Sequence, residues 1–399
     1  MSAILSVALT SALLTEPSLN TLTYQVKQHT FDPSVVTVSV NTSAFTQFQV
    51  IPARTMQSDI QPSLICETST GEQNIATYNT DLTCTNVSWT LSLAEVDQHG
   101  FDIAEQLDSY SADKGWFFIS EFNSLPRFVN HDQQPIDANI ILPNGKKQIM
   151  PKTTQPPLFL VGGLTPISLD INGYQVEISS DTQQVLDAIE QWKPAFETQL
   201  RYLVSLYPQR ATRSWNVAFF ARDKTAGSVS GAAGSDTILV NALQENGKLD
   251  FDSMPMLLKI AAHESMHMIE QSTPLWASES LAEYYAMKSL KKTSYSFVSA
   301  DTQWQQFKQS FPLASTGLLE AHQKVSAQGM QQYYPLFYVK GPAFWLNIDN
   351  ALTEAGSSLD KLVANFTFEA TGELSPSSVK QIMQVIGEEG WQKIAENYL

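Results

Sequence analysis

Apolar and polar residues alternate along much of the chain after its first twenty residues, in a part rich in Thr, Val, Ser and Asn. Alternation with a period of two residues is typical of half-buried β-strands. It predicts short strands at residues 23–26, 35–40 and 87–91, with Pro and Gly between them. We therefore expect a β-rich, sandwich-like N-terminal domain over residues 21–175. The proline-rich stretch 151–166 is expected to form the exit from this domain.

The period of the pattern changes after this domain. Residues 181–206 carry apolar side chains at helical spacing, with Pro194 as the expected position of a kink. Further elements are expected in the order strand, strand, helix, helix, helix, at residues 215–220, 237–240, 254–270, 274–291 and 335–354. The chain is thus predicted to continue as an α+β domain over residues 176–295 and to end in a mainly helical part over residues 296–399.

The N-terminus carries a short apolar run at residues 3–14, too short to span a bilayer. It resembles the apolar region of a secretory signal, with Ser11 and Ala12 as small residues near a cleavage point, although no Lys or Arg precedes it. We expect residues 1–20 to be a signal segment and the protein to be extracytoplasmic, either periplasmic or secreted. No other stretch is apolar enough to cross a membrane.

Cys66 and Cys84 are the only two cysteines. Each follows a strand-like segment, and a polar turn rich in Ser, Thr, Gly and Asn lies between the two segments. A disulfide across this hairpin is expected in an exported protein, and two buried free thiols are the alternative. The pair is not a zinc site, because cysteine ligands usually lie closer together or come in fours.

Composition narrows the class of protein further. The chain has 399 residues with 43% hydrophobic and 16% charged residues, which is typical of a folded protein with more than one domain. Its formal net charge is −16 and it has no basic run. These features argue against nucleic acid or an anionic membrane surface as a partner.

The chemistry of the chain is concentrated in His263-Glu-Ser-Met-His267, which matches the H-E-x-x-H pattern. On a helix, positions i and i+4 lie on one face, so both imidazoles can reach one Zn²⁺ at about 2.0–2.1 Å. Glu264 then lies beside the metal, where it can accept a proton from an attacking water. Asp252 or Ser253 is the expected N-terminal cap of this helix. The alternative interpretation of the motif is a surface helix whose two histidines have no function.

A zinc ion that activates water needs a third protein ligand. Glu279 lies twelve residues after His267, on a second helix that Thr273 and Pro274 are expected to start. This spacing leaves room for a turn and an antiparallel return of the chain. We therefore predict one Zn²⁺ per chain, held by His263, His267 and Glu279.

Glu283 lies one helical turn after Glu279, on the same face. Its functional interpretation is a carboxylate that orients a histidine ligand without touching the metal. The alternative is an ordinary solvated helix residue.

The second helix also carries a family resemblance. Trp276-Ala-Ser-Glu279-Ser-Leu-Ala-Glu-Tyr-Tyr resembles the W-x-x-E-G-x-x-x-Y helix of gluzincin metallopeptidases, in particular the glycyl and alanyl aminopeptidase families and peptidase MA-like proteins. Ser280 takes the place of the usual glycine, and the gap from His267 to Glu279 suits the shorter relatives. The resemblance implies that Glu279 is the third zinc ligand and that residues 176–295 form a thermolysin-like catalytic domain.

A second match lies in the helical C-terminal part. Tyr334-Pro-Leu-Phe-Tyr338-Val-Lys340-Gly341 resembles the Y-x-K-G segment of the same families. The resemblance implies that the Tyr338 hydroxyl stabilises the oxyanion of the tetrahedral intermediate, and a core aromatic is the alternative. The resemblance extends over about residues 180–365, while the N-terminal part matches only in general character.

The substrate segment departs from the family pattern. In the aminopeptidases, an acid on a strand before the zinc helix binds the substrate α-amino group, in a Gly-x-Met-Glu-Asn or Gly-Gly-Leu-Glu segment. The matching stretch here is Gly231-Ala-Ala-Gly-Ser-Asp-Thr-Ile-Leu-Val240, with Gly234 at the position of the acid and Ser235 after it. Asp236, which on a strand points to the opposite face from Ser235, is the alternative partner for the amino group. An ammonium group would stay poorly paired in such a site, which is costly. We expect Gly231, Ala232, Ala233 and Gly234 to bind an extended substrate backbone instead.

These observations predict a zinc metallopeptidase that hydrolyses a peptide or protein substrate, with Glu264 assisting the attack of water. We expect it to be endopeptidase-like or broadly tolerant rather than a strict aminopeptidase. The alternative, from another class, is a catalytically inactive gluzincin-fold binding or scaffold protein. The presence of Glu264, which an inactive protein need not keep, argues against that alternative.

Overall fold

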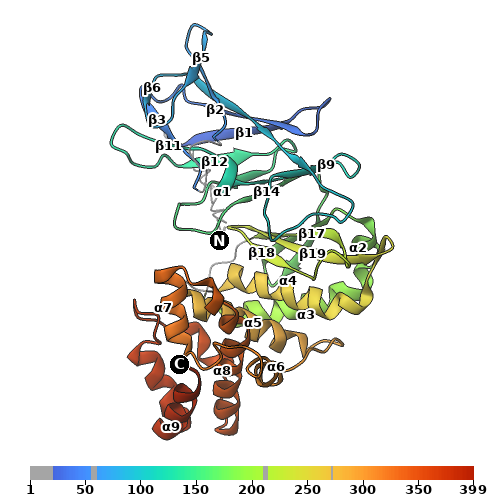
Figure 1. Cartoon of the computed structure of the whole chain (residues 1–399), viewed down its shortest axis with the longest axis vertical. Coiled ribbons are helices and arrows are strands. Elements are labelled where there is room, and N and C mark those ends of the chain that lie inside the picture. Colours follow the sequence, from blue (N-terminus) through green and yellow to red (C-terminus); the bar gives the residue numbers. More distant parts are fainter. Residues whose placement is uncertain (1–20, 55–60, 210–213, 271–272) are drawn as a thin grey trace, which may run out of the picture. The chain divides into compact units, whose positions relative to one another are not determined.

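The computed structural model is shown in Figure 1, and the residues that it describes are 21–54, 61–209, 214–270 and 273–399. The predicted signal segment, residues 1–20, lies outside them. The chain divides into two compact units. The first unit comprises the described part of residues 1–93 together with residues 120–154, and the second comprises residues 94–119 and 155–399.

The described residues of the first unit form two β-sheets. The larger sheet has the strand order β13-β12-β1-β2-β7-β4-β5, and the smaller has the order β11-β3-β6. The strands and the one short helix of this unit are β1 Leu22–Gln28, β2 Val35–Asn41, β3 Phe48–Ile51, β4 Leu64–Glu67, β5 Gln73–Ala76, β6 Asp81–Leu82, β7 Asn86–Ser92, α1 Glu121–Ser124, β11 Arg127–Val129, β12 Ala138–Ile141 and β13 Lys147–Ile149.

Aromatic side chains join the two sheets of the first unit. The ring of Tyr24 on β1 lies 5.8 Å from the rings of both Trp89 on β7 and Phe128 on β11, and Phe128 lies 5.5 Å from Phe48 on β3. All four residues are buried. Because the inward residues of both sheets meet in one core, the first unit has the predicted sandwich-like architecture.

The two cysteines are joined, with their Cα atoms 5.4 Å apart. The strand pairing around them differs from the predicted hairpin. Strand β4, which carries Cys66, pairs with β5 and β7, whereas Cys84 lies in the turn before β7. The hairpin prediction was wrong because the polar residues after Cys66 form a turn into β5, a strand that the alternation did not reveal.

The second unit contains a four-stranded sheet of order β14-β10-β9-β8 and a mixed sheet of order β15-β16-β17-β19-β18, with β20 paired to β19. Strands β16, β17 and β19 run parallel, and the edge strands β15 and β18 are antiparallel to their neighbours. The strands are β8 Ala94–Glu95, β9 Ser109–Ser111, β10 Trp116–Ser120, β14 Phe159–Gly162, β15 Ile167–Ile171, β16 Tyr174–Ser180, β17 Trp215–Asp223, β18 Gly231–Ala233, β19 Thr237–Glu245 and β20 Lys248–Leu249.

Alternate residues of the central strand β17 face two different cores. Ala218 and Phe220 pack against aromatic side chains of the four-stranded sheet, including Phe101 and Trp116. Residues on the opposite face of β17, such as Phe219, join the core formed with the helices. Burial on both faces explains why this strand reads as a continuous apolar run.

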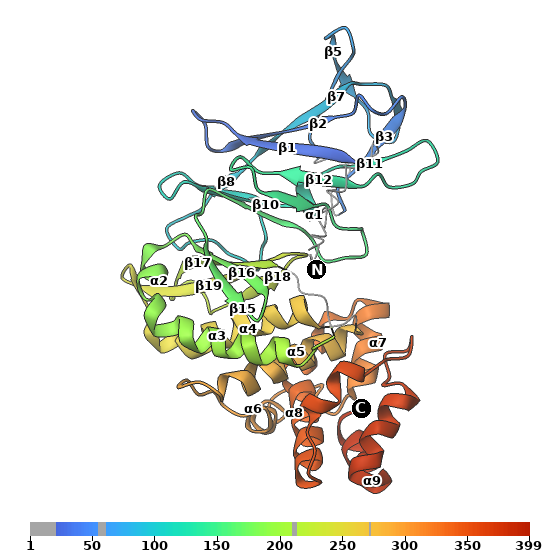
Figure 2. The ribbon, with the colours of Figure 1, turned by 180° about the vertical axis from the view of Figure 1, so that it is seen from behind.

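Helices cover the other face of the mixed sheet and continue to the C-terminus (Figures 1 and 2). The helices are α2 Gln183–Asp187, α3 Ile189–Ser205, α4 Met254–Ile269, α5 Leu275–Leu290, α6 Ala300–Phe307, α7 Leu318–Gln328, α8 Pro335–Glu354 and α9 Pro376–Tyr398, and Gly387 interrupts α9 with a non-helical conformation. The helices predicted at 254–270, 274–291 and 335–354 match α4, α5 and α8 to within one residue. No helix among the described residues is apolar over a length that would cross a bilayer.

Two predicted domain boundaries were wrong. Residues 94–119 and 155–175 belong to the second unit, although they were assigned to a domain spanning residues 21–175. Their strands alternate like those of the first unit, so the local pattern does not show which sheet each strand joins. Residues 296–399 are not a separate unit either, because their side chains share one core with residues 176–295.

Candidate metal centre

Helix α4 presents the H-E-x-x-H residues, and a short turn leads into it. The Asp250 side chain accepts a hydrogen bond from the Asp252 backbone N–H, which caps a 3₁₀ turn directly before α4. The Ser253 hydroxyl donates to the Asp250 carbonyl at 2.7 Å. The two residues predicted as the cap, Asp252 and Ser253, therefore do not cap α4 with their side chains. Pro255 lies in the first turn, where a missing N–H costs no hydrogen bond.

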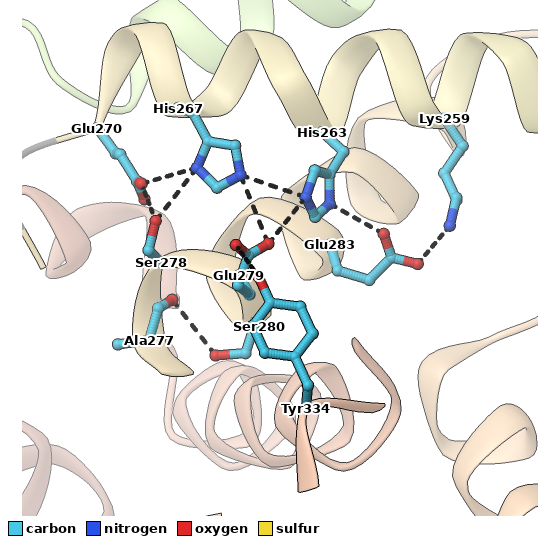
Figure 3. A network of polar contacts seen from close by, with 10 residues as sticks. All are labelled: Lys259, His263, His267, Glu270, Ala277, Ser278, Glu279, Ser280, Glu283 and Tyr334. Carbon is cyan, nitrogen blue, oxygen red and sulfur yellow. Dashed lines mark hydrogen bonds and ion pairs between the residues drawn. The ribbon is translucent and has the colours of Figure 1, made fainter. Parts of the chain in front are cut away.

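The three predicted ligands converge, as Figure 3 shows. The Nε2 atoms of His263 and His267 are 3.3 Å apart, and they lie 3.4 and 3.6 Å from Oε2 of Glu279. A regular tetrahedron around a metal with ligands at 2.0–2.1 Å has edges of about 3.3–3.4 Å. Oε2 of Glu279 is buried and has no hydrogen-bond partner among the described residues. The three donor atoms therefore fit a single Zn²⁺.

Glu283 contacts the first histidine. Its Oε2 lies 3.0 Å from Nδ1 of His263, and its Oε1 forms an ion pair with the ammonium group of Lys259. The residue is 4% exposed. This placement excludes the solvated-face alternative. The role of orienting His263 stays a prediction, and the contact supports it because a carboxylate on Nδ1 directs Nε2 of the ring toward a bound metal.

Replacing Glu283 by Gln should weaken zinc binding by about 10–100-fold, since outer carboxylates of this kind typically contribute that much to metal affinity. The measurement is a competition titration of the purified protein with a chromophoric chelator. Glu320→Gln, which removes an exposed carboxylate on α7, is the matched control and should leave the affinity unchanged. Equal zinc affinities of Glu283→Gln and the control would show that Glu283 does not contribute to metal binding.

The second histidine has an outer carboxylate that the sequence analysis did not identify. Oε1 of Glu270, which directly follows α4, lies 3.0 Å from Nδ1 of His267. The hydroxyl of Ser278 lies 3.1 Å from the same nitrogen and donates a short hydrogen bond to Glu270. An acid three residues after the second histidine was the available signal, because i and i+3 positions are neighbours on a helix.

Two tyrosines of the Y-x-K-G region face the ligands. The Tyr334 hydroxyl, just before α8, donates to Oε1 of Glu279 at 2.9 Å, leaving Oε2 directed at the histidines. The Tyr338 ring stacks on the His263 ring, with centroids 5.6 Å apart and an interplanar angle of 18°. Tyr338 therefore lies at the site as predicted, while the sequence analysis did not assign Tyr334 a role.

Close contact between α5 and α8 brings these tyrosines to the site. A Cβ atom on Gly341 would lie 2.3 Å from the Ser280 Cβ, so only glycine fits at this crossing. The Ser280 hydroxyl accepts a hydrogen bond from the Trp345 indole at 2.7 Å. The serine that replaces the usual glycine of the family pattern is thus accommodated by the glycine on the facing helix.

The charges of the site favour a bound cation. Burial opposes a charge on His263, but the neighbouring carboxylates of Glu279 and Glu283 outweigh it and raise the His263 pKa to about 9. Burial also acts to raise the pKa of Glu279, and the neighbouring imidazoles of His263 and His267 reverse the effect and lower it. Glu279 is therefore ionised at neutral pH, and a bound metal takes the place of the protons that the imidazoles otherwise hold.

Glu264 lies in a different environment from the ligands. It is buried, and burial raises the pKa of its carboxyl group. A raised pKa suits a group that must accept a proton and later return it near neutral pH. A Cβ atom on Gly231 would lie 2.8 Å from Oε1 of Glu264, so the edge strand β18 runs directly beside this carboxylate.

The predicted substrate-binding residues divide into two groups. Gly231, Ala232 and Ala233 form β18, which pairs with β19 on one side and ends the path of the mixed sheet. Gly234 follows the strand in a turn, where its N–H donates to the Thr237 carbonyl at 2.8 Å. A Cβ atom on Gly234 would lie 2.7 Å from the Pro157 carbonyl oxygen. Gly234 therefore packs inside the unit and does not continue the edge, contrary to the prediction.

Comparison with solved structures identifies the fold. An aminopeptidase N family protein from Idiomarina loihiensis matches with a TM-score of 0.58 and 12% identity, over 86% of this chain and 69% of that chain. An M1 zinc metallopeptidase from Deinococcus radiodurans aligns over 95% of this chain and 92% of that chain, with 12% identity and a TM-score of 0.45. No protein-family model matches the sequence, and no curated protein matches it significantly. The first likeness confirms the predicted resemblance to gluzincin metallopeptidases at the level of fold.

Proposed function

We propose that this protein is a zinc-dependent metallopeptidase that hydrolyses peptide bonds, with a thermolysin-like arrangement of its two zinc helices. The observation that carries the proposal is the convergence of the His263, His267 and Glu279 donor atoms at 3.3–3.6 Å from one another, with Glu264 on the same helix. The fold, which resembles that of an aminopeptidase N family protein over 86% of this chain, supports it.

A zinc ion held by these three side chains supplies Lewis-acid activation of a water molecule and of the scissile carbonyl group. Glu264 accepts the proton of the attacking water and afterwards donates it to the leaving amine. Tyr334 holds the second carboxylate oxygen of Glu279, which keeps the other directed inward. The Tyr338 hydroxyl donates to the oxyanion that develops on the substrate carbonyl.

The position of β18 supports binding of an extended substrate. Within the described residues no strand pairs with its outer edge. The strand lies beside Glu264, and a substrate backbone can add to this edge as a further strand. The small side chains of Gly231, Ala232 and Ala233 allow a close approach of that backbone. Substrate main-chain atoms would then lie along β18, with the scissile bond next to the catalytic carboxylate.

We further propose that the enzyme is endopeptidase-like or tolerant of blocked amino termini. An aminopeptidase needs a carboxylate for the substrate ammonium group, and residues 231–235 supply none. The packing of Gly234 against Pro157 leaves no space for an acidic side chain at the family position. The name of the Idiomarina loihiensis neighbour favours the opposite specificity, so the two must be separated by experiment.

The expected result is that zinc-loaded protein cleaves internal bonds of N-terminally acetylated peptides at rates comparable with those for the same peptides with free amino termini. The measurement is a mass-spectrometric digest of a matched peptide library, read alongside hydrolysis of aminoacyl-chromophore substrates. Cleavage confined to free-amine substrates would show a strict aminopeptidase. Zinc-loaded protein that cleaves neither class would instead be a metal-binding protein without peptidase activity.

The Cys66–Cys84 disulfide and the apolar run at residues 3–14 support a further proposal, that the enzyme works outside the cytoplasm.

A further inference from the structure

We infer that Glu270 and Ser278 form a positioning pair that orients His267 for metal binding and connects this ligand to the first turn of α5. The inference rests on the proposed function, because it assigns the pair a role in holding the metal of that site. Glu270 lies outside the motifs that predicted the site, and Ser278 occupies an unspecified position of the W-x-x-E pattern. Both residues contact Nδ1 of His267.

The geometry of the pair is specific to the outer nitrogen of His267. Glu270 Oε1 accepts from two donors, the Nδ1–H of His267 at 3.0 Å and the Ser278 hydroxyl. A carboxylate on Nδ1 fixes the tautomer with a free Nε2, which is the atom that faces the other ligands. The Ser278 hydroxyl holds the carboxylate in place, since it donates to the same oxygen (Figure 3).

The negative charges of Glu270 and Glu283 are compensated by different positive groups. Glu283 forms an ion pair with Lys259, so its charge is compensated without a metal. Glu270 is 7% exposed, and within the described residues its one ion-pair partner is His267. A buried carboxylate needs compensation. When His267 is a neutral ligand, a bound metal ion would supply the compensating positive charge on the other side of the imidazole.

Ser278 adds a connection between the two ligand-bearing helices. It directly precedes Glu279, in the first turn of α5, while Glu270 directly follows α4. The hydrogen bond from Ser278 to Glu270 therefore fixes the end of α4 against the start of α5. His267 and Glu279 are held in register by this bond, as well as by the packing of the helices.

The test is a competition titration of zinc against a chromophoric chelator, together with the visible spectrum of the Co²⁺-loaded protein. Glu270→Gln should weaken zinc binding by about 10–100-fold and change the Co²⁺ spectrum, because the electron density on His267 falls. Ser278→Ala should have a smaller effect in the same direction. The double variant should weaken binding by less than the product of the two single effects, since both act through one contact.

A purely structural role predicts a different result. Asp349→Asn is the control, because Asp349 is a buried carboxylate of the same unit that bonds Lys288 and Tyr284 away from the metal donors. It should lower the unfolding temperature and leave zinc affinity and the Co²⁺ spectrum unchanged. Unchanged affinity in both Glu270→Gln and Ser278→Ala, with zinc binding normally to the unmodified protein, would overturn the inference. Failure of the unmodified protein to bind zinc would instead overturn the proposed function, and the inference with it.

Discussion

Glu264→Gln is expected to keep one zinc per chain and the native fold while losing about 10²–10⁴-fold in peptide hydrolysis, the usual contribution of a general acid–base group. Glutamine has nearly the same shape as the buried glutamate, so the packing beside Gly231 is preserved. It cannot accept the proton of the attacking water, and the loss should therefore fall on kcat. The measurement is steady-state hydrolysis of a peptide that the unmodified enzyme cleaves, with zinc content determined on the same samples.

The matched control for this prediction is Glu245→Gln, the same chemical change at an exposed carboxylate at the end of β19. It should retain full activity. Near-native turnover by Glu264→Gln would show that another group accepts the proton. A loss of zinc in that variant would show that Glu264 is a ligand or supports one.

Removing either histidine should abolish stoichiometric zinc binding. His263→Ala or His267→Ala leaves two of the three protein ligands. We therefore expect zinc affinity to fall by more than roughly 100-fold, the upper range for loss of a residue that only orients a ligand. The measurement is the zinc content of the purified variants after dialysis against a weak chelator. Activity should disappear together with the metal.

His322→Ala is the control for these variants. His322 lies on α7, where its Nδ1 is 3.1 Å from the Ser326 hydroxyl and it has no place among the metal donors. It should keep one zinc per chain. Full zinc occupancy in both His263→Ala and His267→Ala would place the metal site elsewhere in the chain.

The local elements of the site were predictable because their signals are local. The apolar spacing and the proline positions predicted α4, α5 and α8 to within one residue of their observed bounds. Positions i and i+4 on α4 necessarily share a face, so His263 and His267 are neighbours in any fold that keeps the helix. Glu264 follows from the same helix. The family resemblance and the spacing together predicted Glu279 and Glu283.

The same local reasoning failed where strands had to be assigned to sheets. Alternation with a period of two is the same in β14, β15 and the strands of the first unit, so it could not show that β14 and β15 join the second unit. It also missed the pairing of β4 with β5 and β7, which sets the position of the disulfide. Strand pairing depends on contacts between distant residues, and these carry no periodic signal in the chain.

The sequence by itself predicted the metal donors and the proposed catalytic carboxylate, because one helix turn and one following helix contain them all. Only the tertiary structure decided what holds them. The Glu270–Ser278 contact depends on the crossing of α4 and α5, and Tyr334 reaches Glu279 because Gly341 lets α8 approach Ser280. Tyr334 and Glu279 lie 55 residues apart in the chain, so their meeting is set by helix packing and not by spacing along the sequence.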